Sequence, residues 1–361
     1  GSGKLTELGH KIAAEEIELV LIDGAVTPVQ QRNLERAWKT KILDRTGLIL
    51  EIFSDRAATR EGVLQVEMAA LSYQRTRLVR AWTHLERQRG GLGFVGGPGE
   101  TQIEADRRAI DDQLTRLKRQ LDKVVKTRSL HRASRAKVPY PIVALVGYTN
   151  AGKSTIFNRL TGANVLAKDM LFATLDPTMR AITLPTGQEV ILSDTVGFIS
   201  DLPTQLVAAF RATLEEVLSA DIILHVRDIA HPETDTQRDD VMAILEELGV
   251  GPERDVIEVW NKIDQLPASD RKSIRNAAKR IENTVVTSAV AKNGLDLLTK
   301  AIGQTLDKDR RDATVTIKHE DGRSRAWLYD QGVVVKEAKT KNGTRFTVRW
   351  SDVQAERFSR L

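Results

Sequence analysis

Eight consecutive residues near the middle of the chain have the types and the spacing needed to hold a row of phosphates. They fit the pattern G-x-x-x-x-G-K-[ST] and are Gly147, Tyr148, Thr149, Asn150, Ala151, Gly152, Lys153 and Ser154. In such a loop the backbone N–H groups close around the phosphates, the lysine meets the β- and γ-phosphates, and the final hydroxyl binds Mg²⁺. The sequence therefore predicts a nucleoside triphosphate site in which Lys153 contacts the phosphates and Ser154 is a Mg²⁺ ligand.

A strand before this loop and a helix after it must hold it in place. The apolar run at residues 141–146 predicts a buried strand, and a helix is expected from about Lys153 to Leu160. The first turn of that helix includes Thr155 and directs the positive end of the helix dipole at the phosphates. This order of elements is typical of an open α/β sheet.

A second segment at the end of a predicted strand supplies a carboxylate and a backbone donor. Asp194, Thr195, Val196 and Gly197 follow the β-rich run at residues 189–192. We expect Asp194 to hold Mg²⁺ through water and the Gly197 N–H to reach the γ-phosphate.

A third segment selects the base. Asn261, Lys262, Ile263 and Asp264 follow a predicted strand at residues 256–260. A carboxylate at Asp264 can accept both N1–H and the exocyclic N2–H of guanine, whereas adenine offers no such pair of donors and would leave the carboxylate unpaired. The sequence therefore favours GTP over ATP.

A fourth segment follows a predicted strand at residues 284–286, and it contains Ser288, Ala289 and Val290. We assign to Ala289 a backbone N–H that donates to O6 of guanine. Taken singly, the last three segments are common in turns and loops. Their order, each after a β-rich run and with helical stretches between, predicts a P-loop GTPase domain at residues 139–308 that cleaves GTP to GDP and phosphate.

Composition limits what surrounds that domain. The chain has 361 residues, a net charge of +5 and no cysteine. Its length predicts two or three domains, and the lack of cysteine excludes disulfides and thiolate metal sites and fits a reducing compartment. No apolar run approaches the roughly 20 residues that span a bilayer, and the first residues do not have the pattern of a secretory leader. We expect a cytoplasmic protein that requires no membrane.

Residues 1–56 predict a small α/β segment. A strand is expected at residues 18–22, then a helix capped by Thr27 with Pro28 in its first turn, then a second strand at residues 48–53. This order implies a parallel sheet. Two strands and one helix make a thin core and the chain opens without Met, so we expect an upstream part of this domain to be missing.

Residues 57–138 predict a long antiparallel helical hairpin, because two series of mostly apolar residues are spaced by four and three. The first series contains Leu64, Met68, Leu71, Arg75, Leu78, Trp82 and Leu85. The second contains Ile103, Ile110, Leu114, Leu117, Leu121 and Val124. We expect the two stripes to bury each other.

The expected tip of the hairpin, residues 89–100, is rich in glycine and carries Leu92, Phe94 and Val95. A bare connector could be far shorter. Two interpretations are open: a flexible linker, or a probe that becomes ordered on a partner.

The hairpin is also strongly basic. In the later part of the second helix and its exit, residues 116–137, the one acidic residue is Asp122. The basic residues of this stretch are Arg116, Lys118, Arg119, Lys123, Lys126, Arg128, Arg132, Arg135 and Lys137. The first helix adds Arg75, Arg77, Arg80, Arg87 and Arg89. Such an arm favours structured RNA, where contacts go mainly to phosphates, over an acidic membrane surface, for which a broad exposed apolar face would be needed.

Together these features resemble the HflX family of translational GTPases. The resemblance rests on the hairpin tip from Gly90 to Glu104, on the phosphate loop, and on the segments Phe-Ala-Thr-Leu-Asp-Pro-Thr and Asp-Thr-Val-Gly-Phe-Ile, and it runs from about Gly1 to Leu361. It implies a GTP- and Mg²⁺-dependent hydrolase that binds the large ribosomal subunit through rRNA, associates with whole ribosomes, and resembles factors that dissociate stalled ribosomes under stress. We expect a monomer off the ribosome.

The resemblance also assigns a first switch, which comprises Phe172, Ala173, Thr174, Leu175 and Asp176. It makes Thr174 the second Mg²⁺ ligand, sensing the γ-phosphate. Thr178 is the competing candidate on its chemistry alone.

Two further residues bear on hydrolysis. Many GTPases carry a glutamine after Asp-x-x-Gly to orient the attacking water, but this sequence has Phe198, so unaided hydrolysis should be slow. Asn150 resembles the asparagine with which some GTPases hold K⁺ against the phosphates. The residues expected to act in hydrolysis are therefore Lys153, Thr174, Gly197 and Asn150.

Residues 309–361 predict a small α+β domain. Strands are expected near residues 314–317, 333–335 and 345–350, with a hairpin at Asn342-Gly343 whose loop is longer than two residues and a helix at the end. Two rival functions stay open: an ATP- or GTP-dependent RNA-remodelling enzyme, and a non-catalytic RNA-binding adaptor that GTP stabilises.

Overall fold

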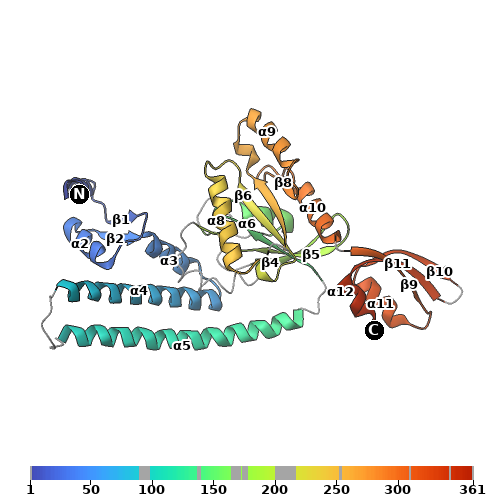
Figure 1. Ribbon diagram of the computed structural model, residues 1–361, viewed down its shortest axis with the longest axis horizontal. Helices are drawn as coiled ribbons and strands as arrows, with labels where there is room; N and C mark the ends of the chain where they lie inside the picture. The colour runs from blue at the N-terminus through green and yellow to red at the C-terminus, as the bar shows by residue number, and fades with distance from the viewer. Residues whose placement is uncertain are drawn as a thin grey trace. The chain divides into compact units, whose positions relative to one another are not determined.

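The structure is a computed structural model that describes residues 2–88, 98–135, 140–163, 172, 178–199, 217–251, 254–308, 310–340 and 343–359 (Figure 1). The chain divides into two compact units. The first unit contains Gly1–Arg135, Phe172–Asp176 and Phe198–Glu215. The second contains Ala136–Leu171, Pro177–Gly197 and Glu216–Leu361.

The first unit begins with a small α/β segment. Helix α1 (Ser2–Ala14) precedes β1 (Leu19–Ile22), and α2 (Pro28–Trp38) connects β1 to β2 (Lys41–Asp44). The two strands are parallel. Thr27 caps α2, because its hydroxyl accepts the Gln30 N–H while the Gln30 side chain accepts the Thr27 N–H. The helix start at Thr27 and Pro28 is confirmed, but the strand parallel to β1 is β2 and not the predicted run at residues 48–53.

The prediction of a strand at residues 48–53 was wrong, because those residues belong to α3 (Arg45–Arg56). Asp44 ends β2 and caps α3, since its carboxylate accepts the N–H of Gly47 at 2.8 Å. The face of α3 that is turned inward carries Gly47, Ile49, Leu50 and Phe53. A short apolar run fits a buried helix as well as a strand, and here the Asp44 cap decides for the helix.

The long hairpin is confirmed. Helices α4 (Arg60–Gln88) and α5 (Pro98–Arg135) lie side by side in the first unit (Figure 1). The inward stripe of α5 is buried or half-buried at Ile110, Leu114, Leu117, Leu121 and Val124. The tip is shorter than residues 89–100, because α5 already begins at Pro98, which suits the first turn of a helix. Leu92, Phe94 and Val95 lie outside the described residues.

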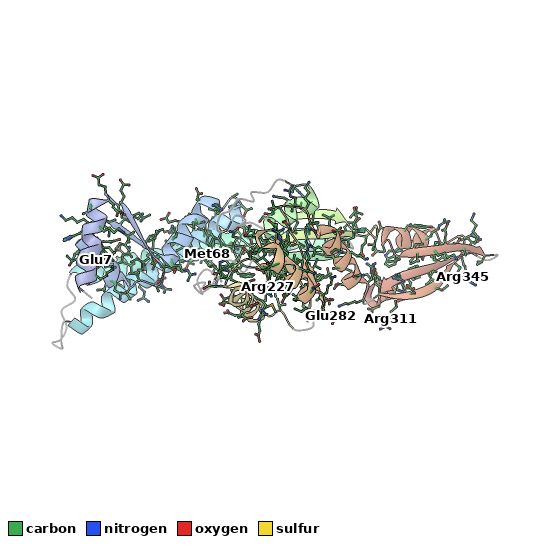
Figure 2. All side chains as sticks on the ribbon, turned by 90° about the horizontal axis from the view of Figure 1, so that it is seen from above. Glu7, Met68, Arg227, Glu282, Arg311 and Arg345 are labelled. Carbon is green, nitrogen blue, oxygen red and sulfur yellow. The ribbon has the colours of Figure 1, made fainter. Side chains whose placement is uncertain are left out.

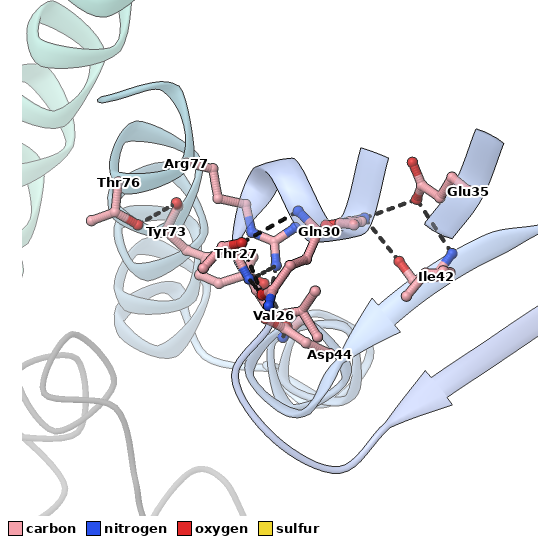
Figure 3. Close-up of polar contacts among 11 residues, drawn as sticks. Val26, Thr27, Gln30, Glu35, Ile42, Asp44, Tyr73, Thr76 and Arg77 are labelled. Carbon is pink, nitrogen blue, oxygen red and sulfur yellow. Dashed lines mark hydrogen bonds and ion pairs between the residues drawn. The ribbon is translucent and has the colours of Figure 1, made fainter. Parts of the chain in front are cut away.

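A polar network fastens α4 to the end of β2 (Figure 3). The hydroxyl of Tyr73 and the guanidinium of Arg77 both donate to the buried carboxylate of Asp44, Arg77 at 2.7 Å. Arg77 also lies 4.4 Å from the centre of the Tyr73 ring. Burial and the Asp44 carboxylate raise the pKa of Tyr73. This network explains why Arg77 serves the fold rather than adding to a phosphate-binding surface.

Arg75 is engaged in a similar way within the hairpin. Its guanidinium lies 2.8 Å from the carboxylate of Asp111 on α5. The basic character of the first helix, as read from the sequence, is therefore partly offset by internal ion pairs at Arg75 and Arg77.

The second unit contains a six-stranded sheet in the order β4-β5-β3-β6-β7-β8. Neighbouring strands are parallel except that β4 runs antiparallel to β5. The strands are β3 (Ile142–Val146), β4 (Thr178–Thr183), β5 (Glu189–Asp194), β6 (Ile222–Asp228), β7 (Asp255–Asn261) and β8 (Thr284–Val286). The helices are α6 (Lys153–Thr161), α8 (Thr234–Glu247), α9 (Ala268–Ala278) and α10 (Leu295–Asp307). The predicted α/β sheet and phosphate-loop helix are confirmed.

One face of this sheet packs against α6 and α10. Its core cluster includes Val143, Leu145, Ile156, Phe157, Leu224, Val226, Val259, Leu298 and Ile302. Side chains alternate along a strand, so His225 and Arg227 of β6 lie on the opposite face. Because the carboxyl ends of parallel strands meet at one edge, the loops after β3, β5, β6, β7 and β8 are brought together there.

The chain ends in a small α+β domain. The antiparallel strands β9 (Arg310–Ile317), β11 (Gly343–Ser351) and β10 (Val334–Thr340) pack with α11 (Gly322–Asp330) and α12 (Asp352–Ser359) around Leu328, Phe346 and Trp350. Arg345 lies exposed on this sheet (Figure 2). The expectation of a long hairpin loop was wrong, because β10 continues to Thr340, which pairs with Gly343. Among the described residues, no helix is long and apolar enough to cross a membrane.

Candidate functional site

The phosphate loop is shaped by backbone conformations that favour glycine. Gly147 and Gly152 have φ of 149° and 98°. A Cβ at Gly147 would lie 2.1 Å from the carbonyl oxygen of Val226, so β6 passes too close for any side chain there. Asn150 also has a left-handed φ, of 61°, which asparagine tolerates better than most residues. These backbone conformations therefore fix the course of the loop from β3 into α6.

Lys153 is held inside this loop. It is buried, and its ammonium donates to the carbonyl oxygens of Gly147 at 3.0 Å and Tyr148 at 2.8 Å. Burial lowers the pKa of Lys153 to about 8, and the nearby Asp194 carboxylate acts in the opposite direction. A phosphate group would supply the negative charge that this buried ammonium needs.

The candidate Mg²⁺ ligands lie on two elements of the second unit. Asp194 ends β5 and is completely buried, while Ser154 is the second residue of α6. A carboxylate and a hydroxyl are the hard oxygen donors that Mg²⁺ prefers, so these residues fit the ion. Thr174 lies outside the described residues, as do Ala173, Leu175 and Asp176. Thr178, the competing candidate, pairs in register with Asp194 across β4 and β5.

The backbone at Gly197 passes close to the phosphate loop. A Cβ at this position would lie 3.0 Å from Thr149 and 3.1 Å from the Lys153 ammonium. This close approach places the backbone after β5 directly beside the phosphate loop. The loop after β5 and the loop after β3 are therefore brought together, as the sequence predicted for residues 194–197.

Asn261 ties three loops to one another. Its amide donates to the carbonyl oxygen of Ala151 at 2.9 Å, and its side-chain oxygen accepts from the Thr287 hydroxyl at 3.2 Å and the Ala289 N–H at 3.1 Å. A Cβ at Gly152 would lie 2.2 Å from the Asn261 amide nitrogen. The sequence named Asn261 as part of a base-binding motif but gave no sign of this linking role.

The base-recognition loop is supported from outside the motif. Asp264 lies in a short 3-10 turn at Ile263–Gln265. Arg271 of α9 donates to the carbonyl oxygens of Asp264 at 2.6 Å and Leu266 at 2.7 Å. Sequence reasoning missed Arg271, because no motif includes a residue seven positions beyond Asp264.

The N–H of Ala289 is engaged in this structure, since it donates to Asn261. Donation to O6 of guanine, as assigned from the sequence, requires this N–H to be shared or released. Ser288 is buried, and Val290 beside it is 69% exposed.

A second group of charges lies on the sheet face opposite α6 and α10. Arg227, labelled in Figure 2, donates to Glu258 at 2.9 Å and to Asp235 at 2.6 Å, and Trp260 donates to the same Glu258 carboxylate. Burial lowers the pKa of His225, two residues away, to about 4. Sequence reasoning did not predict this network, because none of the motifs includes a residue of β6.

Within the first unit, Phe172 is held by α3. Its ring lies against that of Phe53, with both rings buried, and its carbonyl oxygen accepts a hydrogen bond from Arg56 at 2.9 Å. Phe172 has a left-handed φ of 54°, a strained backbone for an aromatic residue. Phe198 is likewise buried. Sequence reasoning placed Phe172 in the first switch but did not predict its partners.

Models of known protein families match four consecutive parts of the chain. They are described as GTP-binding GTPase N-terminal at residues 1–54, GTP-binding GTPase Middle Region at residues 56–135, 50S ribosome-binding GTPase at residues 142–262, and HflX C-terminal domain at residues 273–361. A protein from Magnetococcus marinus named GTPase HflX is 50% identical over 347 residues, which cover 96% of this chain and 79% of that protein.

The chain belongs to the HflX family of GTPases. GTPase HflX of Escherichia coli is 44% identical, over 95% of this chain and 80% of its own length. Family membership makes this chain a GTP hydrolase that binds GTP with Mg²⁺. Among solved structures, a GTP-binding protein from Sulfolobus solfataricus in complex with GDP is similar, with a TM-score of 0.47 and 25% identity over 84% of this chain and 85% of that one.

Proposed function

We propose that this GTPase binds the large ribosomal subunit through the basic face of α5 and that the ribosome stimulates its GTP hydrolysis. The observation that carries the proposal is the charge of that face. Between residues 116 and 126 of α5 the cations are exposed, whereas the apolar stripe of the same helix is turned inward. They are Arg116, Lys118, Arg119, Lys123 and Lys126. Phosphates of folded rRNA match a row of exposed cations on a rigid helix.

Neutralising this row tests the binding step. In a variant with glutamine at all five positions, binding to purified large subunits should weaken by more than about tenfold, and the slope of affinity against salt should become shallower. Co-sedimentation at several salt concentrations measures both quantities. A control variant has glutamine at five exposed cations of the GTPase domain, namely Lys272, Arg275, Lys279, Arg280 and Lys292. Equal weakening in both variants would contradict docking through α5.

We further propose that the bound protein separates ribosomal subunits. Sedimentation of intact ribosomes mixed with this chain and GTP, a non-hydrolysable analogue or GDP tests this step. We expect free subunits with GTP and with the analogue, and none with GDP. If Lys153→Ala still splits ribosomes through repeated rounds, the adaptor function is favoured instead. If the chain has ATPase activity that disappears when residues 1–137 are deleted, an ATP-driven remodelling enzyme is favoured.

Phe198 supports the proposed dependence on the ribosome. Its side chain cannot hydrogen-bond a water molecule, so the attacking water must be oriented by another group. We propose that K⁺, held by Asn150, assists in neutralising the developing charge on the phosphates. Hydrolysis on ribosomes should therefore be faster in K⁺ than in Na⁺ for the native chain and equal in both for Asn150→Ala. Rapid turnover in Na⁺ without ribosomes would contradict this.

Recognition of guanine is proposed to depend on Asp264. Replacing the carboxylate by an amide, in Asp264→Asn, leaves one acceptor oxygen where guanine presents two donors, N1–H and N2–H. The new NH₂ group faces the guanine N2–H as a second donor, but it can donate to the carbonyl at position 2 of xanthine. GTP binding should weaken while xanthosine triphosphate binding improves. Unchanged affinity for GTP, measured by equilibrium fluorescence titration, would overturn the assignment.

A further inference from the structure

The base-recognition loop has a charged support that belongs to none of the sequence motifs. The ammonium of Lys262 lies 2.8 Å from a carboxylate oxygen of Asp228, and the two side chains are 17% and 13% exposed. Asp228 is the last residue of β6. The pair thus connects the end of β6 to the loop that carries Asp264.

Both carboxylate oxygens of Asp228 are engaged. One receives the Lys262 ammonium, and the other accepts the N–H of Ala230 at 3.1 Å, which turns the chain after β6. Asp228 is also paired in register with Asn261 across β6 and β7, and the N–H of Ile229 donates to the Asn261 carbonyl at 3.1 Å. Asp228 therefore lies in register with the residue that ties the phosphate loop to the base-recognition loop.

Lys262 needs such a partner, because its backbone is strained. Its φ is 64°, in the left-handed region that is unfavourable for a non-glycine residue. Ile263 and Asp264 follow directly, so the direction of the Asp264 carboxylate depends on the conformation at Lys262. An ion pair shielded from water offsets the strain and holds one conformation.

We propose that Asp228 is a positioning residue that sets how long a guanine nucleotide stays bound. Through Lys262 it holds the base-recognition loop in its binding conformation before nucleotide arrives. Removing its charge leaves the strained loop free to relax between turnovers. This inference rests on the assignment of guanine recognition to Asp264.

The test is the rate at which a fluorescent GDP analogue dissociates from the full chain. In Asp228→Asn the amide cannot neutralise Lys262, and we expect release about tenfold faster than in the native chain. The KM for GTP should rise by a similar factor while kcat changes by less than about twofold. A merely structural loss would instead lower kcat and the melting temperature together.

A matched control lies at the other end of the same two strands. Asp255 begins β7, pairs in register with Ile222 at the start of β6, and has Lys308 as its cation at 4.0 Å. Asp255→Asn removes one carboxylate from the same sheet but leaves the base-recognition loop untouched, so release should not change. Equal acceleration in Asp255→Asn, or release from Asp228→Asn within about twofold of the native rate, would overturn the proposal.

A second pair of variants keeps the test decisive if Asp228→Asn is unstable. When Lys262 is already Gln, the further change Asp228→Asn should add little to the release rate, because the partner is gone. Additive effects would overturn the proposal. Asp264→Asn separates the role of Asp264 in guanine recognition from the role of Asp228 in nucleotide release. If Asp264→Asn does not gain affinity for xanthosine diphosphate, guanine recognition is wrongly assigned to Asp264. If it does gain affinity but Asp228→Asn has no effect on release, only the role of Asp228 is refuted.

Discussion

The ring of Phe172 stands edge-on against the ring of Phe53, with 4.6 Å between the ring centres and 75° between their planes. Both rings are almost fully buried, and Arg56 adds a hydrogen bond to the Phe172 carbonyl. A residue of the proposed first switch is therefore packed into the N-terminal α/β segment. If the switch moves when nucleotide binds, either the contact between Phe172 and Phe53 must break or α3 must move with the switch.

The aromatic contact should be measurable as a coupling energy. In a double-mutant cycle, Phe53→Leu and Phe172→Leu should couple by about 1 kcal/mol, the value of a buried aromatic pair beyond its area. Hydrogen exchange of the α3 amides gives the local opening free energy. As a control, the free-energy changes of Phe53→Leu and of Phe346→Leu in the C-terminal domain should add. If the changes of Phe53→Leu and Phe172→Leu also add, the two rings do not stabilise each other.

Nucleotide binding should take up a proton above pH 8. The buried Lys153 has a pKa of about 8 in the nucleotide-free protein, and the negative phosphates must raise it. At pH 8.5 part of the protein carries a neutral lysine that becomes charged on binding GDP, whereas at pH 6.5 the lysine is charged throughout. Calorimetry in two buffers of different ionisation enthalpy counts these protons. Equal uptake at both pH values would contradict the assignment.

His225 should make the GTPase domain sensitive to acid. Its pKa is about 4 in the fold against 6.5 when unfolded, so the unfolded state binds a proton first and stability is lost as the pH falls from 6.5 towards 4. The loss should reach about 2 kcal/mol at pH 5. Unfolding in urea, followed by amide exchange of β6, should show this loss of stability in the native chain. The variant His319→Leu, which replaces an exposed histidine, should show the same loss, and His225→Leu should not.

Because Asn261 lies so close to Gly152, a single methyl group at position 152 should strongly weaken GTP binding. In Gly152→Ala the new Cβ would meet the Asn261 amide at 2.2 Å and force it away from the phosphate loop, so GTP affinity should fall by more than about tenfold. Gly187→Ala is the matched control, because its φ of 82° carries the same backbone strain but nothing lies within 4 Å. Fluorescence titration of both variants isolates the collision from the strain.

Local signals in the sequence were sufficient for β3, β5, β7 and β8 of the GTPase domain, because each of these strands is a β-rich run followed by a motif. They did not predict β4 or β6, which no motif follows. They were also sufficient for the α5 stripe at Leu117 and its neighbours. They failed at residues 48–53, where the Asp44 cap turns an apolar run into a helix. They could not find Arg271 or Asp228, because contacts made across the tertiary fold leave no pattern in local spacing.

The same limit applies to charge. Counting cations along the chain cannot separate Arg77, which is neutralised by Asp44 far away in the sequence, from Lys118, which is exposed. Only the folded arrangement shows which part of the basic hairpin is available to a partner.

We propose that docking of α5 on the large ribosomal subunit controls GTP hydrolysis. The most direct test is a titration of purified large subunits against the rate of GTP hydrolysis in K⁺ buffer, for the native chain and for the variant with glutamine at Arg116, Lys118, Arg119, Lys123 and Lys126. We expect a saturable rise in the rate for the native chain, and we expect the variant to require more than about tenfold more subunits for the same rise. A rate that subunits do not raise, or that rises identically in both proteins, would contradict it.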